Sequence, residues 1–356
     1  MAVRRPRTAA KKPREGGGRV LAAAALASLV IAGALGFLWW GAAPRAEQLF
    51  LRSTWARLDA PARAALYLRS AAAGRLGDGL QPCAGLLEPA AFARGGTRVR
   101  GAMASVDLRG GEMCTLGEGA LLTVASVRKQ LGESSSGRPR LSQEVASLGD
   151  LVQSAADERA LLALLLMRED ARASSPLMPY LQALLHRAHE HIPSAWDPSS
   201  AEGAERRAEL ERDAGPRTLR AADELRRVIS AHYTALVPRA LEQLPTLLLD
   251  GVVDAEYYSE QRFIEFWLSI RSRSFENNGF GVLVPLACLL NHPPTHEPSN
   301  VELQYVAQRN GFVMKATRHI KQGEELTYSY GSNLCKERAL LVYGFVQDGM
   351  PSCPGF

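Results

Sequence analysis

Two clusters of strand-like sequence, separated by a long helical block, constrain the fold of this chain most strongly. Residues 97–124 consist of short apolar runs broken by glycines, which is typical of small strands and tight turns. Residues 150–244 carry apolar positions at helical spacing, and strand-like sequence resumes near Gly281 and continues to Tyr330. Neither cluster has enough strands to bury a sheet alone. We therefore predict one α+β domain of small β-sheets with a long helical insertion.

The first 43 residues differ in composition from the rest of the chain. Residues 1–19 contain seven basic residues and one acidic residue, so the remainder is nearly neutral although the whole chain has a formal net charge of +5. Basic arms of this kind are usually disordered. Nothing beyond the arm indicates a surface that follows phosphates, so we predict no direct nucleic-acid partner.

Residues 20–43 are uncharged and apolar, and a helix of this length crosses a hydrocarbon core roughly 30 Å thick. Trp39 and Trp40 suit the headgroup region, and the basic arm outweighs Arg45 and Arg52 beyond the span. We predict a single-pass membrane protein with a cytosolic N-terminus. A cleaved signal or an organelle-targeting leader is the alternative, although the apolar stretch exceeds the roughly 7 to 15 residues of a signal peptide.

The cysteines are odd in number, widely spaced and without a Cys-x-x-Cys pair. This pattern predicts neither a disulfide framework nor a structural zinc site. His186, His189 and His191 are a second candidate for metal binding, but a polar helix end explains them as well, and we predict no metal. The cysteines are Cys83, Cys114, Cys288, Cys335 and Cys353.

Three segments in the last third of the chain combine arginine, asparagine, histidine and aromatic residues. The first has two parts, one with an Arg-x-Phe step and one with an apolar run that ends in Asn-His. The second ends in Tyr-Gly, and the third is an apolar run that contains a tyrosine. The segments read Arg271-Ser-Arg-Ser-Phe275 with Leu283-Val-Pro-Leu-Ala-Cys-Leu-Leu-Asn-His292, Gly323-Glu-Glu-Leu-Thr-Tyr-Ser-Tyr-Gly331, and Leu340-Leu-Val-Tyr-Gly-Phe-Val346.

In order and spacing, these segments resemble the SET-domain protein methyltransferases. They are most similar to the branch with a helical insert that includes Rubisco large-subunit lysine methyltransferase and actin-histidine methyltransferase. Residues 98–112 resemble the opening glycine turn of that branch, and residues 164–185 resemble its insert. The resemblance implies a SET-type fold, S-adenosylmethionine as methyl donor and a protein substrate, with lysine as the acceptor. Histidine as acceptor, or a SET-fold binding or scaffold protein without turnover, are the alternatives.

The resemblance also implies roles for individual residues. Methyl transfer is an in-line displacement, so holding donor and acceptor in line dominates the chemistry. Tyr330 is implied as the catalytic residue that orients the acceptor amine, and Tyr343 and Cys288 are implied to line the substrate channel. The residues implied to bind the donor are Arg273, Phe275, Asn291, His292, Arg100 and Gly101.

Two positions depart from the pattern of the branch. Cys288 stands where the branch has an aspartate, so a carboxylate able to bind a cationic acceptor is missing. Val99 stands where the branch favours glycine, so a β-branched residue occupies a position expected to need a positive φ. The first departure leaves the type of acceptor open, and the second predicts weakened donor binding.

The predicted organisation ends without the cysteine-rich, zinc-binding tail of many SET enzymes, because only Cys353 lies beyond the last motif. The predicted segments are a basic arm (1–19), a transmembrane anchor (20–43), a helical stem (44–84), N-terminal strands (85–132), a helical insert (133–260), a catalytic half (261–348) and a tail (349–356).

Overall fold

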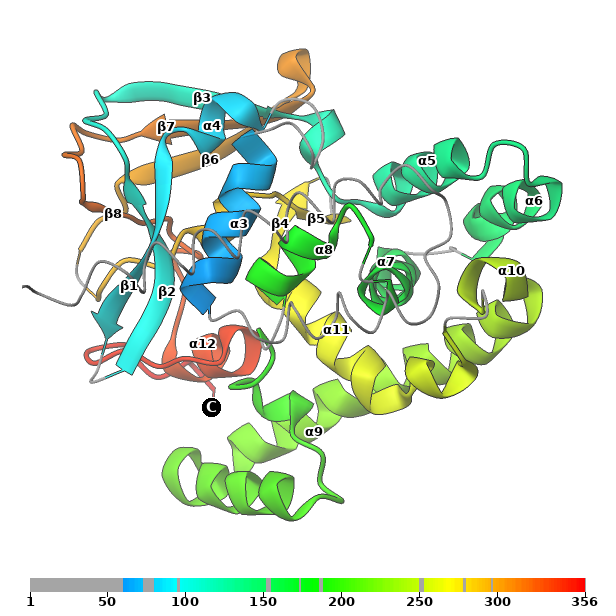
Figure 1. Ribbon diagram of the computed structural model, residues 1–356. Coiled ribbons are helices and arrows are strands. Elements are labelled where there is room, and N and C mark those ends of the chain that lie inside the picture. The colour runs from blue at the N-terminus through cyan, green and yellow to red at the C-terminus, as the bar shows by residue number, and fades with distance from the viewer. Residues whose placement is uncertain are drawn as a thin grey trace, which may run out of the picture.

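The strands gather in one half of the molecule and most helices in the other (Figure 1). The computed structural model describes residues 60–72, 80–94, 97–151, 155–172, 174–185, 188–249, 253–277, 280–295 and 297–355. Within these residues, two helices come first, strands and then a block of helices follow, and strands return before a last helix. The expected α+β fold with small sheets and an inserted helical block is confirmed.

Two three-stranded sheets and one hairpin form the β half. Each three-stranded sheet joins strands from before and after the helical block, so the block is an insertion into one folding unit. The first sheet has the antiparallel order β1 (Leu87–Arg94), β2 (Thr97–Ala104), β8 (Glu325–Leu326), and the second β3 (Gly111–Gly117), β7 (Gly311–Ala316), β6 (Val301–Val306). The hairpin pairs β4 (Ser274–Asn277) with β5 (Phe280–Leu283).

The helices before, within and after the insertion differ greatly in length. The α-helices are α3 (Ala60–Ala72), α4 (Gln81–Ala84), α5 (Val124–Ser134), α6 (Pro139–Ser147), α7 (Ala155–Ala171), α8 (Met178–Tyr180), α9 (Ala201–Gln243), α10 (Pro245–Leu248), α11 (Glu260–Arg273) and α12 (Lys336–Tyr343). The short turns are η1 (Glu118–Ala120), η2 (Leu148–Leu151), η3 (Leu181–Leu185), η4 (Pro193–Ala195), η5 (Ala255–Tyr258), η6 (Ala287–Leu289) and η7 (Ala307–Arg309).

The helical block begins earlier than the sequence pattern predicts. Val124, expected within the strand cluster, is the first residue of α5. The hydroxyl of Thr123 accepts from the backbone N–H of Ser126 at 3.1 Å, and the backbone N–H of Thr123 donates to the Ser126 hydroxyl at 2.9 Å. This reciprocal cap satisfies two amides that would otherwise lack partners, and so it starts the helix.

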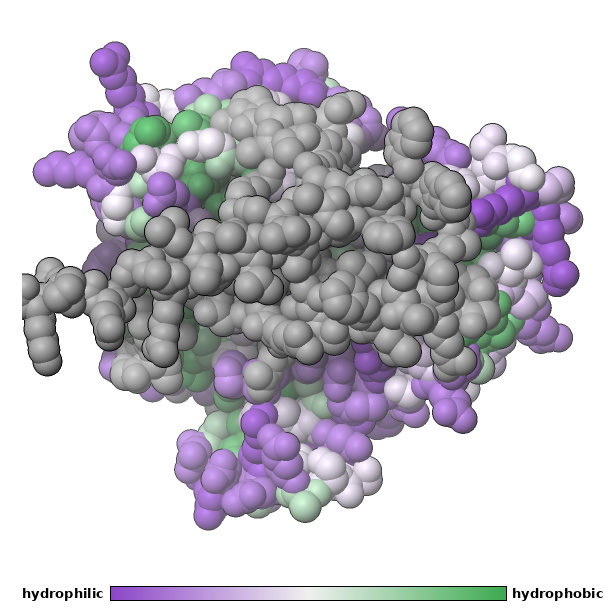
Figure 2. Space-filling view, viewed as in Figure 1, coloured by the Kyte–Doolittle hydropathy of each residue, from purple (hydrophilic) through white to green (hydrophobic). Residues whose placement is uncertain are grey.

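Helix α7 forms the centre of the helical half, where Figure 1 shows it surrounded by other helices. Every residue from Ala160 to Met167 is at most 2% exposed, because α5, α9 and α11 contact α7 from different directions. A helix that is apolar all round is buried on all sides. In contrast, mostly hydrophilic residues cover the protruding α9 at the bottom of Figure 2.

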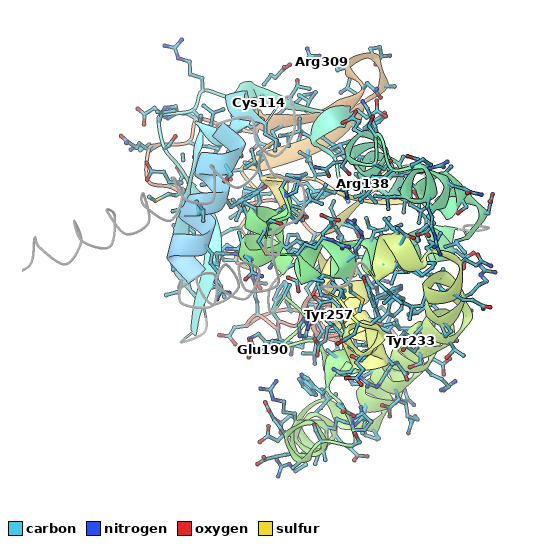
Figure 3. The ribbon with its side chains drawn as sticks, turned by 45° about the vertical axis from the view of Figure 1, so that its right-hand side comes forward. Cys114, Arg138, Glu190, Tyr233, Tyr257 and Arg309 are labelled. Carbon is cyan, nitrogen blue, oxygen red and sulfur yellow. A yellow bond between two sulfur atoms is a disulfide. The ribbon has the colours of Figure 1, made fainter. Side chains whose placement is uncertain are left out.

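The cysteine prediction is wrong, because the structure contains two disulfides. Cys83 of α4 pairs with Cys114 of β3, which Figure 3 labels, and Cys335 pairs with Cys353 in the tail. Their Cα atoms lie 5.4 Å and 5.1 Å apart, within the usual range for a disulfide. Only the fold brings these distant partners together, so spacing along the sequence gave no sign of them. Cys288 stays free and is buried.

The predicted arm, the predicted anchor at residues 20–43 and much of the predicted stem lie outside the described residues. Helices α3 and α4 are the described parts of the stem. Among the helices that the structure describes, none combines the length and the apolar character needed to cross a bilayer.

Opening either disulfide should lower the free energy of unfolding, because each one restricts the unfolded chain. The partners are 31 and 18 positions apart, so loop-closure entropy predicts a loss of about 3 to 4 kcal/mol for each paired Cys→Ser variant. Urea unfolding with and without reductant measures the loss. The matched control is Cys288→Ala, whose response to reductant should equal that of the wild type. Unchanged unfolding midpoints in both paired variants would contradict the disulfides.

Candidate functional site

The buried main-chain segment of residues 284–292 organises the predicted site. It contains η6, and its carbonyl groups accept hydrogen bonds from two predicted site residues. Arg273, the last residue of α11, donates through Nη1 to the carbonyl oxygen of Cys288 at 2.7 Å. The Tyr330 hydroxyl donates to the carbonyl oxygen of Leu290 at 2.8 Å. The segment therefore links the end of the helical insertion to the motif that ends in Tyr330-Gly331.

Asn291 and His292 connect this segment to the sheet and to the strand-like segment around Tyr330. The carbonyl oxygen of Asn291 accepts from the Tyr328 backbone N–H at 2.9 Å, and its side-chain amide donates to Glu325 at 3.0 Å. His292 Nδ1 accepts from the Tyr330 backbone N–H at 3.2 Å, and burial lowers the pKa of this imidazole. Both effects favour a neutral His292 at physiological pH.

Gly101 allows β2 to approach Asn291 closely. A Cβ atom at Gly101 would overlap the Asn291 side-chain amide and lie 2.9 Å from the Phe92 ring, which is too short for a real contact. Gly101 is buried and pairs with Ala90 inside the first sheet. The glycine is thus required by space and not by a positive φ.

The charges of Arg100 and Arg273 act on one another. Burial, followed by the charge of Arg273, lowers the pKa of Arg100 to about 9, so Arg100 remains protonated at neutral pH. Among the described residues, no carboxylate forms an ion pair with either group. The pair therefore forms a positive site suited to a carboxylate ligand.

Aromatic rings surround the ring of Tyr330. Between centroids, the Tyr330 ring lies 4.6 Å from that of Tyr343, 5.5 Å from that of His292 and 6.2 Å from that of Phe345. Phe275 contacts the adjoining Tyr328 ring at 5.4 Å. Burial raises the pKa of Tyr330 to about 12 and also raises the pKa of Tyr343. Both phenols are therefore neutral at physiological pH.

Cys288 is 3% exposed, and its thiol donates to the carbonyl oxygens of Arg273 at 3.3 Å and Val284 at 3.1 Å. Its place in the substrate channel stays a prediction, while its contacts lie with the buried main chain. Val99 lies within β2 and, among the described residues, is not one of those with positive φ. The expectation that Val99 strains the backbone is therefore wrong, because this position is extended strand.

Arg273, Tyr330 and Gly101 thus contact the segment that contains Cys288, Asn291 and His292. Phe275 and Tyr343 are joined to it through the rings of Tyr328 and Tyr330, and Arg100 through its charge. Sequence reasoning missed several neighbours of these residues. Tyr328 precedes Tyr330 by two positions and Phe345 follows Tyr343 by two, so the alternation of side chains along extended chain was an available signal for Tyr328. Tyr67 contacts the Leu286 amide and Tyr180 contacts the Cys288 sulfur. Both tyrosines lie far from the segment in sequence, so no sequence pattern indicated them.

The partners of His189 argue against the alternative that His186, His189 and His191 bind a metal. Its Nδ1 lies 3.3 Å from the Ser269 hydroxyl, while His186 lies outside the described residues. A metal-ligand grouping in the described residues is Cys335, Glu337 and Cys353. The two cysteines form a disulfide, so they offer no thiolate to a metal.

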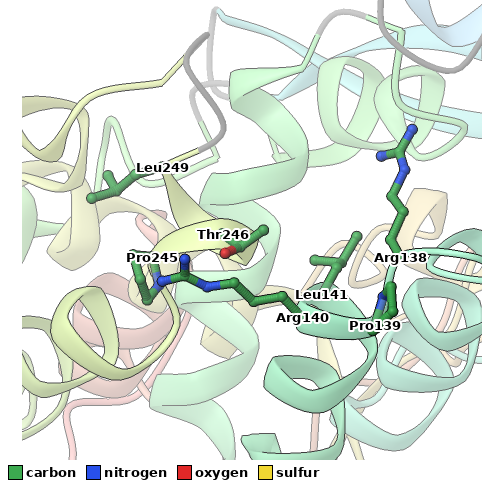
Figure 4. A pocket seen from close by; sticks show the side chains of 7 residues that line it. All are labelled: Arg138, Pro139, Arg140, Leu141, Pro245, Thr246 and Leu249. Atoms are coloured by element: carbon green, nitrogen blue, oxygen red, sulfur yellow. The ribbon is translucent and has the colours of Figure 1, made fainter.

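A separate hollow of about 600 Å³ lies between α6 and α10, and none of the predicted site residues lines it. Arg140 extends from α6 toward Pro245 and Thr246 of α10, as Figure 4 shows. Arg140 also lies 3.5 Å from the Glu144 carboxylate, which receives the backbone N–H groups of Thr246 and Leu247. These polar groups of α6 and α10 therefore pair with one another in a contact between the two helices. The hollow is not the candidate site.

Gly101→Ala should disturb the site because the added methyl group overlaps Asn291. We expect a loss of about 1 to 3 kcal/mol in the free energy of unfolding, together with displacement of the Asn291 side chain. Urea unfolding and a crystal structure of the variant measure the two effects. Gly110→Ala is the matched control, since its Cβ would meet nothing closer than 3.7 Å. Equal stability of both variants would contradict the close approach of β2 to Asn291.

Comparison with known proteins agrees with this arrangement. A SET domain family model matches residues 100–331. The SET domain of LSMT bound to lysine and AdoHcy is similar in structure, with a TM-score of 0.56 and 15% sequence identity over 80% of this chain and 57% of that chain. Rubisco LSMT bound to AdoMet has a TM-score of 0.47 and 16% identity over 74% of this chain and 52% of that chain.

No curated protein matches this chain in sequence. The chain spans little more than half the length of the solved structures described above. The family model nevertheless covers more than half of the chain and includes both strand clusters. This protein therefore belongs to the SET domain family.

Proposed function

We propose that this protein is an S-adenosylmethionine-dependent protein N-methyltransferase that acts on lysine. One observation carries the proposal: Arg273 and Tyr330 both donate to carbonyl groups of residues 284–292, which also contain Asn291 and His292. All four residues lie inside the SET domain match, and they come from two separate motif segments.

The residues present fit the donor. Arg100 and Arg273 supply cations for a carboxylate, and Gly101 leaves space where β2 meets Asn291. Half-buried aromatic rings of Phe275 and Tyr328 offer faces to an adenine or a sulfonium. When bound, S-adenosylmethionine supplies a methyl group that is activated by its positively charged sulfur. The protein's own groups then bind and orient the donor, and they exclude water from it.

Tyr330 suits an orienting role better than a role as base. Its phenol has a pKa of about 12 and its proton is donated to the Leu290 carbonyl oxygen, so the hydroxyl oxygen remains able to accept from an amine N–H. The charges that act on this hydroxyl include those of Arg273 and Arg100. Nearby cations disfavour an ammonium, whose reference pKa is about 10.4, and thus favour the neutral amine that attacks.

Lysine is proposed over histidine because a similar fold, the SET domain of LSMT, was solved with lysine bound. Cys288 supplies a neutral thiol where the branch has a carboxylate, and burial raises the pKa of that thiol. A neutral group leaves the site more positive, which is consistent with deprotonating an amine acceptor.

Calorimetric titration of the full-length protein in detergent with S-adenosylmethionine tests the donor, and transfer of a labelled methyl group to a protein extract tests the reaction. We expect saturable binding and labelled lysine after hydrolysis of the protein. Absence of donor binding would overturn the proposal. Donor binding without transfer to any extract would favour a binding protein, and labelled histidine would favour the other acceptor.

Tyr330→Phe should reduce methyl transfer on the order of a hundredfold, because an acceptor misplaced by about 1 Å can cost that much in rate. The lost bond to Leu290 should change the free energy of unfolding by only about 1 kcal/mol. Initial rates at saturating donor measure the effect. Tyr305→Phe is the matched control, since it removes a hydroxyl bonded to Asn310 in an exposed turn. Equal rates in the two variants would remove Tyr330 from the reaction.

We also propose that the folded domain lies on the non-cytosolic side of its membrane. Two disulfides suit an oxidising compartment, and the charge bias around residues 20–43 favours the same side. This location requires that methyl donor be available there.

Protease protection of a C-terminal tag in intact membrane vesicles checks the orientation. We expect the tag to be digested only after detergent is added. Labelling with a thiol-reactive polymer under non-reducing, denaturing conditions provides the second measurement, because only Cys288 should react. A tag digested in intact vesicles, with five reactive cysteines, would place the domain in the cytosol.

A further inference from the structure

A strained turn lies at the start of the segment that organises the site. Leu286 has φ 70° and ψ −50°, a combination close to the γ-turn that residues with a side chain rarely adopt. Leu286 is fully buried and directly precedes η6. Strain of this kind persists only where surrounding groups hold the backbone in place, and it is concentrated at functional sites.

Tyr67 of α3 supplies a group that holds this turn. Its hydroxyl oxygen accepts the backbone N–H of Leu286 at 2.7 Å, across 219 positions of sequence. Both residues are 0% exposed, so water does not replace the hydroxyl as a partner. Burial raises the pKa of Tyr67 well above its ordinary value, which keeps the hydroxyl neutral. Helix α3 lies before the SET domain match, which begins at residue 100.

A second tyrosine completes the support behind the segment. The rings of Tyr67 and Tyr180 meet edge to face at 5.9 Å, and the Tyr180 hydroxyl lies 3.6 Å from the Cys288 sulfur. The Cys288 thiol in turn donates to the carbonyl oxygen of Arg273. Elements from outside the family match and from the helical insertion thus contact the same short segment.

We propose that Tyr67 is a positioning residue for the donor site, acting through the turn at Leu286. The turn sets the direction of the following main chain, which presents the Cys288 carbonyl to Arg273 and the Leu290 carbonyl to Tyr330. It also places Asn291 and His292 themselves. This inference rests on the proposed function, since its effect is read through donor binding.

Tyr67→Phe removes only the oxygen and leaves the Leu286 N–H buried without a partner. Relaxation of the turn should then weaken S-adenosylmethionine binding about tenfold or more, measured by calorimetry on the full-length protein. Tyr258→Phe is the matched control. Tyr258 is 1% exposed and donates to Leu248 in the helical half, so its loss should lower the unfolding midpoint similarly and leave donor binding unchanged.

Three outcomes are distinguishable. Donor binding that weakens in Tyr67→Phe and not in Tyr258→Phe supports the inference. Donor affinities within twofold of wild type in both variants, with similar losses of stability, overturn it and reduce Tyr67 to a packing residue. Failure of the wild-type protein to bind donor overturns the proposed function itself.

Hydrogen exchange keeps the inference testable if Tyr67→Phe does not fold. In the donor-free wild-type protein, the peptide covering residues 284–292 should exchange as slowly as α7, because its amides are held before donor arrives. Exchange of the Leu286 amide at the rate of an exposed loop would overturn the role of Tyr67. In a folded variant, this amide should exchange about tenfold faster, with α7 unchanged.

Discussion

Burial of the main chain at residues 284–292 is the constraint on which the site depends. A buried carbonyl or amide without a partner is costly, so each must be paired. The partners here are the functional groups themselves: the Arg273 guanidinium, the Tyr330 hydroxyl and the Tyr67 hydroxyl. Satisfying the backbone and assembling the site are therefore one event in folding. A chain that buried this segment without those side chains would be less stable.

The two arginines show the opposite relation between stability and ligand binding. Burial and the charge of Arg273 both lower the pKa of Arg100, so holding its charge in the folded protein is unfavourable. A hydrogen bond to the Cys288 carbonyl offsets part of the corresponding cost for Arg273. A bound anion would offset more of this cost.

The sequence predicted those features that depend on neighbouring residues along the chain. Arg273, Asn291, His292 and Tyr330 stand in motifs whose sequence is distinctive, and the strand-helix-strand order follows from periodicity. Tyr67 could not be predicted, because its function depends on a contact with a residue 219 positions away. The prediction of no disulfides was wrong for the same reason, because the paired cysteines are 31 and 18 positions apart.

One further error has a local cause. Thr123 and Ser126 form a cap in a run that otherwise resembles a strand, so the helix starts there. The burial of α7 on all sides, in contrast, depends on neighbouring helices that only the fold supplies. The disulfide between Cys335 and Cys353 has a different consequence, because it makes α12, Tyr343 and Phe345 part of a covalent ring. A single peptide-bond cut within that ring leaves both new ends attached to the protein through the disulfide. Proteolysis at one site therefore does not release Tyr343 and Phe345 from their place beside Tyr330.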